Sequence, residues 1–294
     1  MYPGVERFLA SWHRSVEAQR DRDFDLWIAL DGLTPAGVRD SIGHDVAATW
    51  VSGSPGDTPA QVRQRVLEAV AVRCDGVVLV DSDDLLRPSR VGAARRALRH
   101  ADLSVCALRL VDEFGHDLGS TLGPPAGADA AAVLPQANVF GLSNTAYRCD
   151  LLRRCLPIPA TAEAVDWYLA TRAWLLAATV HADPVARMDY RQYGSNMTVV
   201  RPPFGEAQVR RDTARVLAHL ALAASAVPED ALPERVRALA AATAEVGAFR
   251  QRVVAAPERL SAYVRRLEGL AWPKAWWSHV ASPALADMWR EPAA

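Results

Sequence analysis

The chain has 294 residues, half of them hydrophobic, with a formal net charge of −1 and four cysteines. This length allows one large domain, or one domain with an appendage. The balanced charge argues against a strongly basic protein that binds nucleic acid, so we expect no nucleic-acid partner. The cysteines are scattered and lack C-x-x-C spacing. This argues against a disulfide framework or a zinc knuckle and favours buried free thiols.

The chain carries no sign of export. Its first residues lack the basic and apolar pattern of a signal peptide. The longest strongly apolar run, residues 216–227, is too short to cross a bilayer. Lys274 is the only lysine beside many arginines and alanines, which is typical of a GC-rich bacterial genome. We therefore expect a cytoplasmic bacterial protein, and peripheral attachment to the inner membrane stays open.

The first 111 residues alternate between strand and helix patterns. The apolar spacing predicts strands at residues 24–30, 46–51, 76–80 and 103–111, and helices at 5–19, after 35, from 58 and from 88. Such alternation is typical of a parallel α/β sheet, whose ligands bind at the carboxyl ends of the strands. Asp31 and the cluster Asp81 to Asp84 each follow a strand. We expect them to share one site.

The pattern changes after residue 111. It predicts a hairpin at 112–119 with Gly115 at its tip, a mobile loop at 123–132, strands at 138–148 and 185–193, and a helix at 164–177. From residue 204 to 294 two apolar stripes predict helices only. The domains expected are therefore an α/β domain at 1–203 and a helical C-terminal extension at 204–294.

The stripes of the extension need a surface to cover them. Acidic residues interrupt its basic ones, which argues against a membrane-binding face. We expect the helices to fold back on one another and on the α/β domain. A homodimer through these helices is the second option, and a membrane is the third.

The segment VVLVDSDDLLRPSRV, residues 77–91, places three carboxylates within four positions at the end of a strand. Carboxylates crowded in this way repel one another and resist desolvation. A hard divalent cation, Mg²⁺ or Mn²⁺, would compensate the charge and share its oxygen ligands with a phosphate group. The chain contains no P-loop, G-x-G-x-x-G, H-E-x-x-H or G-x-S-x-G motif, so the commonest competing chemistries are excluded.

LVDSDDLLRP resembles the D-x-D segment of family-two glycosyltransferases, the inverting, nucleotide-sugar-dependent enzymes of the GT-A fold. Further segments follow in the order of that family within about residues 2–200: FDLWIALDG, FGLSNTAYR, AVDWYLATR and YRQYGSN. The resemblance implies a GT-A-like α/β fold with a mainly parallel central sheet flanked by helices. It also implies a hexosyltransferase-like activity.

The resemblance also implies a role for each matching residue. Asp31 and Asp81 would bind the donor, and Arg191 would lie near its diphosphate. Asp83, with Asp81, would hold Mn²⁺ or Mg²⁺, and Asp84 would support them. Asp166 would be the general base, and Asn144 and Trp167 would line the acceptor pocket. The partners implied are a nucleotide-sugar donor, a UDP-sugar first, and a glycan, lipid-linked or small-molecule acceptor.

Three features depart from the family pattern. The family begins with an apolar strand, for which Met1-Tyr2-Pro3 leaves no room, so we expect a few upstream residues to belong to the native protein. A single Asp31 after Leu30 replaces an acidic pair. Tyr193 stands where the family usually has histidine.

Other interpretations stay open. The chain could be a non-catalytic binding or scaffold protein that keeps the fold, or a nucleotidyltransferase that attacks an α-phosphorus. Residues 81–84 could be solvated carboxylates that cap the next helix. Asp166 could be an ordinary acid at a helix N-terminus, and Arg191 a surface ion pair.

Overall fold

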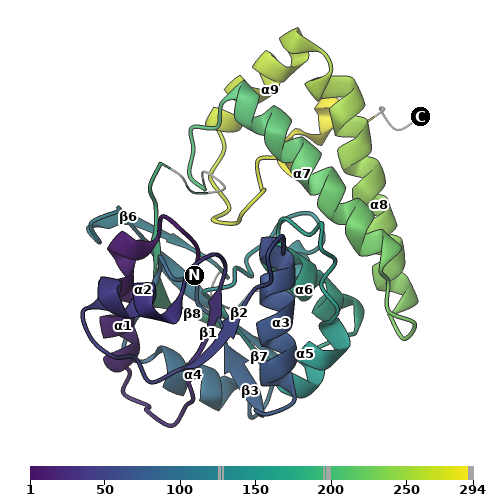
Figure 1. Cartoon of the computed structure of the whole chain (residues 1–294). Helices are drawn as coiled ribbons and strands as arrows, with labels where there is room; N and C mark the ends of the chain where they lie inside the picture. The colour runs from purple at the N-terminus through teal and green to yellow at the C-terminus, as the bar shows by residue number, and fades with distance from the viewer. Residues whose placement is uncertain (125–126, 128, 195, 197–199, 291–294) are drawn as a thin grey trace.

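The computed structural model describes residues 1–124, 127, 129–194, 196 and 200–290. An α/β part forms the lower half of the molecule and a group of helices stands above it (Figure 1). The upper helices are α7 (Glu206–Ser225), α8 (Pro233–Phe249) and α9 (Pro257–Glu268), and a π-helical turn at Arg250–Val254 joins the last two. The α/β class and the helical extension are both confirmed.

The first helices begin where their sequence signals predict. These are α1 (Glu6–Glu17), α2 (Pro35–Ile42) and α3 (Pro59–Ala71). At the start of α3 the Thr58 hydroxyl accepts a hydrogen bond from the Gln61 amide at 3.3 Å, and the Gln61 side chain accepts one from the Thr58 amide at 2.8 Å. This reciprocal capping box satisfies two amides that the helix leaves unpaired.

Two sheets form the α/β part. Strands β1 (Trp27–Leu30) and β2 (Thr49–Ser52) make a parallel pair. The larger sheet has the order β3-β7-β5-β8-β4, with β6 paired to β5. Its strands are β3 (Gly76–Val78), β4 (Leu85–Leu86), β5 (Leu103–Val111), β6 (Asp117–Leu122), β7 (Thr145–Arg148) and β8 (Val180–Arg191).

The larger sheet is mixed, which corrects the mainly parallel sheet expected from the sequence. Only β5 and β8 pair in parallel there, whereas β3–β7, β5–β7, β5–β6 and β4–β8 are antiparallel. Strand β7 comes later in the chain and inserts between β3 and β5. Local periodicity predicts where a strand lies, but it does not predict a later strand that separates two earlier ones.

The remaining elements of the α/β part are α4 (Arg90–Ala97), α5 (Cys149–Cys155), α6 (Val165–Leu175) and a short 3₁₀ turn at Ala130–Val133. A second 3₁₀ turn, Pro283–Met288, packs against α9 in the upper group of helices. The hairpin turn with Gly115 at its tip is confirmed, with φ of +95° at that glycine. Of the predicted loop at 123–132, residues 125, 126 and 128 lie outside the described part of the chain.

The predicted strand at 138–148 is shorter than expected. Only residues 145–148 pair, as β7. Upstream, the Asn138 side chain accepts a hydrogen bond from the Phe140 amide at 2.9 Å and donates one to the Phe140 carbonyl at 3.1 Å. An asparagine that binds nearby backbone in this way favours a turn over a strand.

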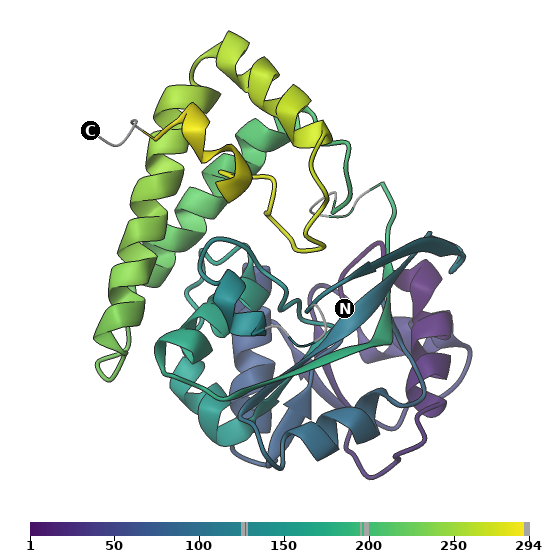
Figure 2. The same ribbon diagram turned by 180° about the vertical axis from the view of Figure 1, so that it is seen from behind.

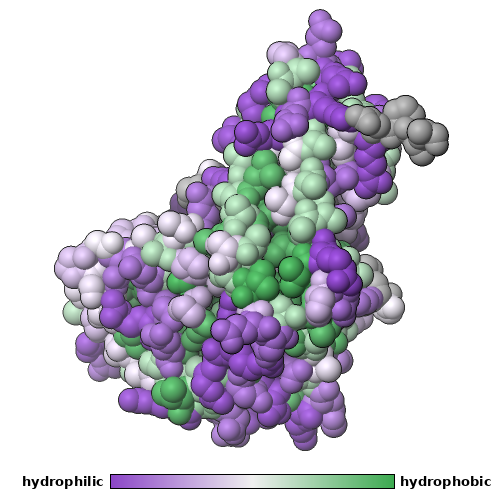
Figure 3. Space-filling model, turned by 90° about the vertical axis from the view of Figure 1, so that its right-hand side faces the viewer, coloured by the Kyte–Doolittle hydropathy of each residue, from purple (hydrophilic) through white to green (hydrophobic). Residues whose placement is uncertain are grey.

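The helical extension packs on the α/β part, as expected. The Trp167 ring of α6 stacks on His219 of α7 with 4.0 Å between ring centroids, and the Leu232 amide donates to the Leu175 carbonyl at 3.0 Å. Hydrophobic side chains gather along the long helices and where they meet the α/β part (Figure 3). Among the described residues, no helix combines the length and apolar character that a bilayer crossing requires.

The chain also returns to the α/β part after α9. Figure 2 shows this last segment running down towards the sheets and back. Trp276 pairs with Asn138 through two backbone hydrogen bonds of 3.1 and 2.8 Å, and the Gly123 amide donates to the Lys274 carbonyl at 3.0 Å. The extension therefore contributes directly to the upper surface of the α/β part.

We predict that removal of residues 204–294 makes the α/β part poorly soluble. The deletion uncovers Trp167, which is 1% exposed in the full chain, and the apolar side chains beside it. Exposed apolar patches of this kind promote association. Soluble yield and binding of a hydrophobic dye measure the effect against the full chain. A truncated chain that stays soluble and fully active, with a separate tail that binds lipid vesicles, would contradict this packing.

Candidate donor-binding and transfer site

A cavity of 1740 Å³ opens where β1 and β3 end. Four of the carboxylates singled out in the sequence line it: Asp31, Asp81, Asp83 and Asp166. They come from three separate segments, after β1, after β3 and from the first turn of α6. The expectation that the strand ends share one site agrees with this arrangement.

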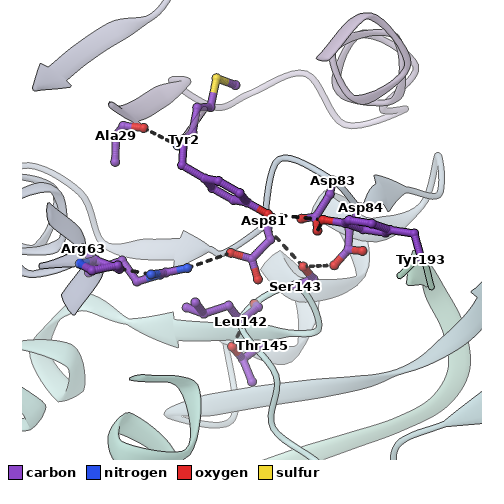
Figure 4. A network of polar contacts seen from close by, with 12 residues as sticks. Tyr2, Ala29, Arg63, Asp81, Asp83, Asp84, Leu142, Ser143, Thr145 and Tyr193 are labelled. Carbon is purple, nitrogen blue, oxygen red and sulfur yellow. Dashed lines mark hydrogen bonds and ion pairs between the residues drawn. The ribbon is translucent and has the colours of Figure 1, made fainter. Parts of the chain in front are cut away.

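The loop after β3 holds Asp81 and Asp83 in different environments (Figure 4). The Asp81 amide donates to the Ser143 hydroxyl at 3.0 Å, and its carboxylate lies 3.4 Å from the Arg63 guanidinium. The Asp83 carboxylate accepts a hydrogen bond from the Tyr193 hydroxyl at 2.6 Å. Burial raises the pKa of Asp83, and the charge of Asp81 raises it further. The two carboxylates are therefore crowded and only partly compensated.

Asp84 and Arg191 hold this loop against the sheet. Asp84 is buried, and its carboxylate accepts hydrogen bonds from the Ser143 hydroxyl and, at 2.9 Å, from the Arg191 amide. The Arg191 guanidinium donates to the carbonyls of Asp83 at 2.7 Å and Glu113 at 2.6 Å. Arg191 is thus buried, and its guanidinium binds backbone carbonyls of the Asp83 loop and of Glu113. This position differs from the diphosphate contact and from the surface ion pair that were considered from the sequence.

Tyr193, which departs from the family pattern, contacts the Asp83 carboxylate directly. Its hydroxyl lies between Asp83 and the Tyr2 hydroxyl, which is 3.2 Å away. A hydrogen bond to the ionised carboxylate favours the charged form and lowers its pKa. This bond orients the Asp83 side chain and opposes the rise in its pKa that burial causes.

We predict that Tyr193→Phe weakens metal-dependent nucleoside diphosphate binding by roughly 10–150-fold. The change removes a hydrogen bond to a charged group, which is worth roughly 1.5–3 kcal/mol. Because the pKa of Asp83 then rises, binding should also shift to higher pH. Calorimetric titration from pH 5 to 8 measures both effects, with Tyr2→Phe as the matched control. Equal affinities in the two variants would exclude this role.

Asp166 faces the same cavity from the start of α6. The Asn138 side-chain amide donates to its carboxylate at 3.3 Å. Burial raises the pKa of Asp166 to about 6, and the negative charge of Asp81 acts in the same direction. A carboxylate with a raised pKa, in a cavity with other charged groups, has the properties of a proton acceptor near neutral pH.

The structure does not bring the two expected acceptor-pocket residues to this cavity. Asn144 is fully buried, and its amide donates to the carbonyls of Cys106 at 2.7 Å and Val139 at 2.9 Å. Trp167 lies instead beside a second cavity of 340 Å³, between α6 and α7. Trp276 and Trp277 line the main cavity, a contribution of the C-terminal segment that the sequence did not indicate.

Two further residues of the site were missed by reasoning from the sequence. Arg63 follows the apolar Val62 on α3 and has the pattern of an ordinary exposed helix residue. Ser143 lies within the segment FGLSNTAYR, but the resemblance gave it no role. Both reach the cavity because non-local contacts place α3 and residues 141–143 beside the loop of Asp81. No local signal identifies Arg63, whereas the segment FGLSNTAYR marked the region of Ser143 without indicating its contact with Asp81.

The donor set fits a hard divalent cation. Asp81 and Asp83 supply carboxylate oxygens, and each has a second oxygen besides the one near Arg63 or Tyr193. Magnesium and manganese prefer oxygen ligands and are often held by one or two carboxylates together with substrate phosphates. Burial and the charge of Asp81 both raise the pKa of Asp83, which means that two ionised carboxylates at this position are disfavoured unless a positive charge lies beside them. These residues therefore suit a metal that the donor diphosphate helps to coordinate.

Comparisons with known proteins agree with the resemblance in the sequence. No protein-family model matches the chain, and no curated protein is significantly similar to it. Several solved structures are similar to the chain, and two of them are transferases that cover most of it. The mannosyltransferase PcManGT from Pyrobaculum calidifontis, in complex with GDP-Man and Mn²⁺, has a TM-score of 0.56 and 18% identity, over 98% of this chain and 76% of that one. S. aureus TarS (residues 1–349) has a TM-score of 0.55 and 14% identity, over 84% and 69%. The chain therefore has the GT-A-like α/β fold of these transferases, with a helical extension.

Proposed function

We propose that the chain is a metal-dependent inverting glycosyltransferase that moves a sugar from a nucleotide diphosphate-sugar to an acceptor hydroxyl. One observation carries the proposal most strongly. The carboxylates Asp31, Asp81, Asp83 and Asp166 come from three segments far apart in the sequence, and all line one cavity at the carboxyl ends of strands. Ligands of open α/β folds bind at this position. PcManGT, which has the same fold, is described in complex with GDP-Man and Mn²⁺.

The metal ligands in this proposal are Asp81 and Asp83, with Mn²⁺ or Mg²⁺. When bound, the ion would neutralise charge on the leaving diphosphate. Tyr193 and Arg191 keep the Asp83 side chain and backbone in place. Arg63 lies beside Asp81, where its positive charge can also face the diphosphate. Asp31 lines the cavity after β1 and is the proposed contact for the nucleoside.

Asp166 is the proposed general base. An inverting transfer needs a carboxylate that takes the acceptor's proton on the face of the sugar opposite the leaving group. Because the pKa of Asp166 is raised to about 6, its carboxylate is ionised at neutral pH and is more basic than an ordinary aspartate. Asn138 holds one of its oxygens and leaves the other side of the carboxylate towards the cavity.

The acceptor is proposed to enter beneath the C-terminal segment. Trp276 and Trp277 line the cavity together with Asp166 and Arg215. Aromatic side chains beside polar groups suit a sugar-containing acceptor, such as a glycan or a lipid-linked saccharide. This proposal assigns to the Trp276 segment the acceptor role that the family resemblance implied for Asn144 and Trp167.

A thermal-shift panel of nucleoside diphosphates, each with and without Mn²⁺, tests the proposal. A ligand present at a hundred times its dissociation constant stabilises the folded state by about 2.7 kcal/mol, which is roughly 5 °C for a chain of this size. The expected result is a shift for one nucleobase that requires the metal. The anomeric configuration of the product, followed by NMR with the matching donor, then tests inversion.

The competing functions give different results in the same experiments. A non-catalytic binding protein would show the thermal shift without release of nucleoside diphosphate from the sugar donor. A nucleotidyltransferase would release pyrophosphate from a nucleoside triphosphate. Either result would replace the proposed transfer.

A further inference from the structure

Away from the main cavity, two histidines and a glutamate meet where α1 and α2 pack together (Figure 1). Among the described residues, one group of three or more histidine, cysteine, aspartate or glutamate side chains has its ligand atoms within 4.8 Å of one another. It consists of His13, Glu17 and His44. None of these three residues lines the main cavity. We call them the His–Glu–His cluster.

Two features of the sequence bring the cluster together. His13 and Glu17 are four residues apart on α1, so their side chains lie on the same face of the helix. Gly43 ends α2 with φ of +93°, a left-handed conformation that favours glycine, and the chain turns there. His44 follows directly, and its ring lies edge-on to the His13 ring with 4.9 Å between the centroids. The cluster therefore joins α1 to the end of α2.

The buried ring nitrogen of His13 has no hydrogen-bond partner. His13 is 6% exposed, and a carboxylate oxygen of Glu17 lies 3.6 Å from its Nδ1, beyond hydrogen-bonding distance. A buried polar atom without a partner is uncommon and indicates strain, a water or an ion. The 3.6 Å distance is close to the roughly 3.4 Å between two ligand atoms of a tetrahedral zinc with bonds of about 2.0–2.1 Å.

His44 has the hydrogen-bond pattern of a metal ligand. Its Nδ1 lies 2.9 Å from the Asp45 carbonyl oxygen. A carbonyl can only accept a hydrogen bond, so Nδ1 carries the hydrogen and the lone pair is on Nε2. Metal-binding histidines usually donate their other ring N–H to a carbonyl or a carboxylate, which fixes the orientation of the ring. His44 is therefore already held in the tautomer that binds a metal through Nε2.

The surroundings of the cluster also favour metal binding. Burial lowers the pKa of His13, although the charge of Glu17 raises it, and the neutral imidazole is the form that binds a metal. The Glu17 side chain is 51% exposed, so the cluster is open to solvent on that side. An ion can enter there, and a water molecule has room to complete its coordination.

We propose that the His–Glu–His cluster binds Zn²⁺ through one nitrogen of each histidine and a carboxylate oxygen of Glu17, with water in the fourth position. Two imidazoles and one carboxylate are a known ligand set of zinc. Imidazole suits zinc, whereas Mg²⁺ and Mn²⁺ prefer oxygen ligands, so this site differs in metal preference from the pair Asp81 and Asp83. The proposal is independent of the proposed transferase activity.

Helix α1 connects this site to the loop of Asp83. The Ser15 hydroxyl accepts a hydrogen bond from the Leu86 amide at 3.1 Å, and the Ser11 hydroxyl accepts one from the Arg191 guanidinium at 3.3 Å. An ion that joins α1 to the end of α2 therefore holds a helix that supports this loop. Because the ion binds the folded arrangement of two separate segments, it should stabilise the folded chain.

Titration of the full chain with Zn²⁺, without nucleotide, tests the proposal. We expect one ion per chain and, at about a hundred times the dissociation constant, a rise in melting temperature of roughly 5 °C. His44→Ala and Glu17→Gln should each weaken Zn²⁺ binding at least about tenfold, since both remove a ligand. Both side chains are exposed, so the fold should tolerate the changes. His116→Ala is the matched control, because His116 is exposed and pairs with Asp112, four residues away, at 2.9 Å.

Two further measurements separate this site from the carboxylate pair in the main cavity. Zn²⁺ affinity should survive Asp83→Asn, and Co²⁺ bound to the full chain should give the strong visible absorption of four-coordinate cobalt, which His44→Ala should remove. Zn²⁺ affinity that is unchanged in His44→Ala would overturn the proposal, as would an equal loss in His116→Ala. Loss of Zn²⁺ binding in Asp83→Asn alone would place the ion in the main cavity and would also overturn it.

Discussion

Replacement of Asp166 by asparagine should lower the rate of sugar transfer by roughly 10²–10⁴-fold, the usual contribution of a general base. The substitution keeps the volume and the hydrogen-bonding capacity of the side chain and removes its ability to take a proton. Donor binding should be unchanged, because the proposed donor ligands lie after β1 and β3. Single-turnover transfer rates and calorimetric donor affinities measure the two effects separately.

The same assignment predicts a specific pH dependence of the transfer. Since burial raises the pKa of Asp166 to about 6, the carboxyl group is protonated below that pH and cannot act as a base. We expect kcat/KM to fall about tenfold per pH unit below pH 6 and to level off above it. The ionised carboxylate is disfavoured in the folded protein, so the asparagine variant should be at least as stable at pH 7.

Asp150→Asn is the matched control. Asp150 occupies the first turn of α5 as Asp166 does in α6, but it is exposed and pairs with Arg148 at 3.3 Å. If both substitutions leave transfer intact, Asp166 is only a carboxylate at a helix N-terminus, where the helix dipole stabilises its negative charge.

Asp83→Asn should remove the metal dependence of nucleoside diphosphate binding. The loss should exceed the roughly 10–100-fold effect of losing an outer-shell partner of a metal ligand. Burial and the charge of Asp81 both raise the pKa of Asp83, so the neutral asparagine should not lower stability in the absence of metal. Thermal shift and titration with Mn²⁺ measure the result, with the exposed Asp45→Asn as control. Metal-linked affinity that survives in a folded Asp83→Asn protein would refute the assignment of the metal site.

Much of the local structure could be predicted from the sequence alone. Caps such as Thr58 with Gln61, and apolar stripes such as that of α1, depend on neighbours within one or two turns, so periodicity and capping residues indicate them directly. The strand ends that carry Asp31 and Asp81 could be predicted for the same reason, and their meeting at one edge followed from the α/β pattern.

Contacts between distant segments were decided only in the tertiary structure. The insertion of β7 between β3 and β5 made the sheet mixed, because strand pairing depends on the whole chain and not on the period of one segment. The same holds for the site. Arg191 matched a family motif but lies as a buried clamp on the loop of Asp83, and Trp276 reaches the cavity from the end of the chain. The sequence determined which residue types could do the chemistry, while packing determined which of them face the cavity, since side-chain direction and burial are properties of the assembled core.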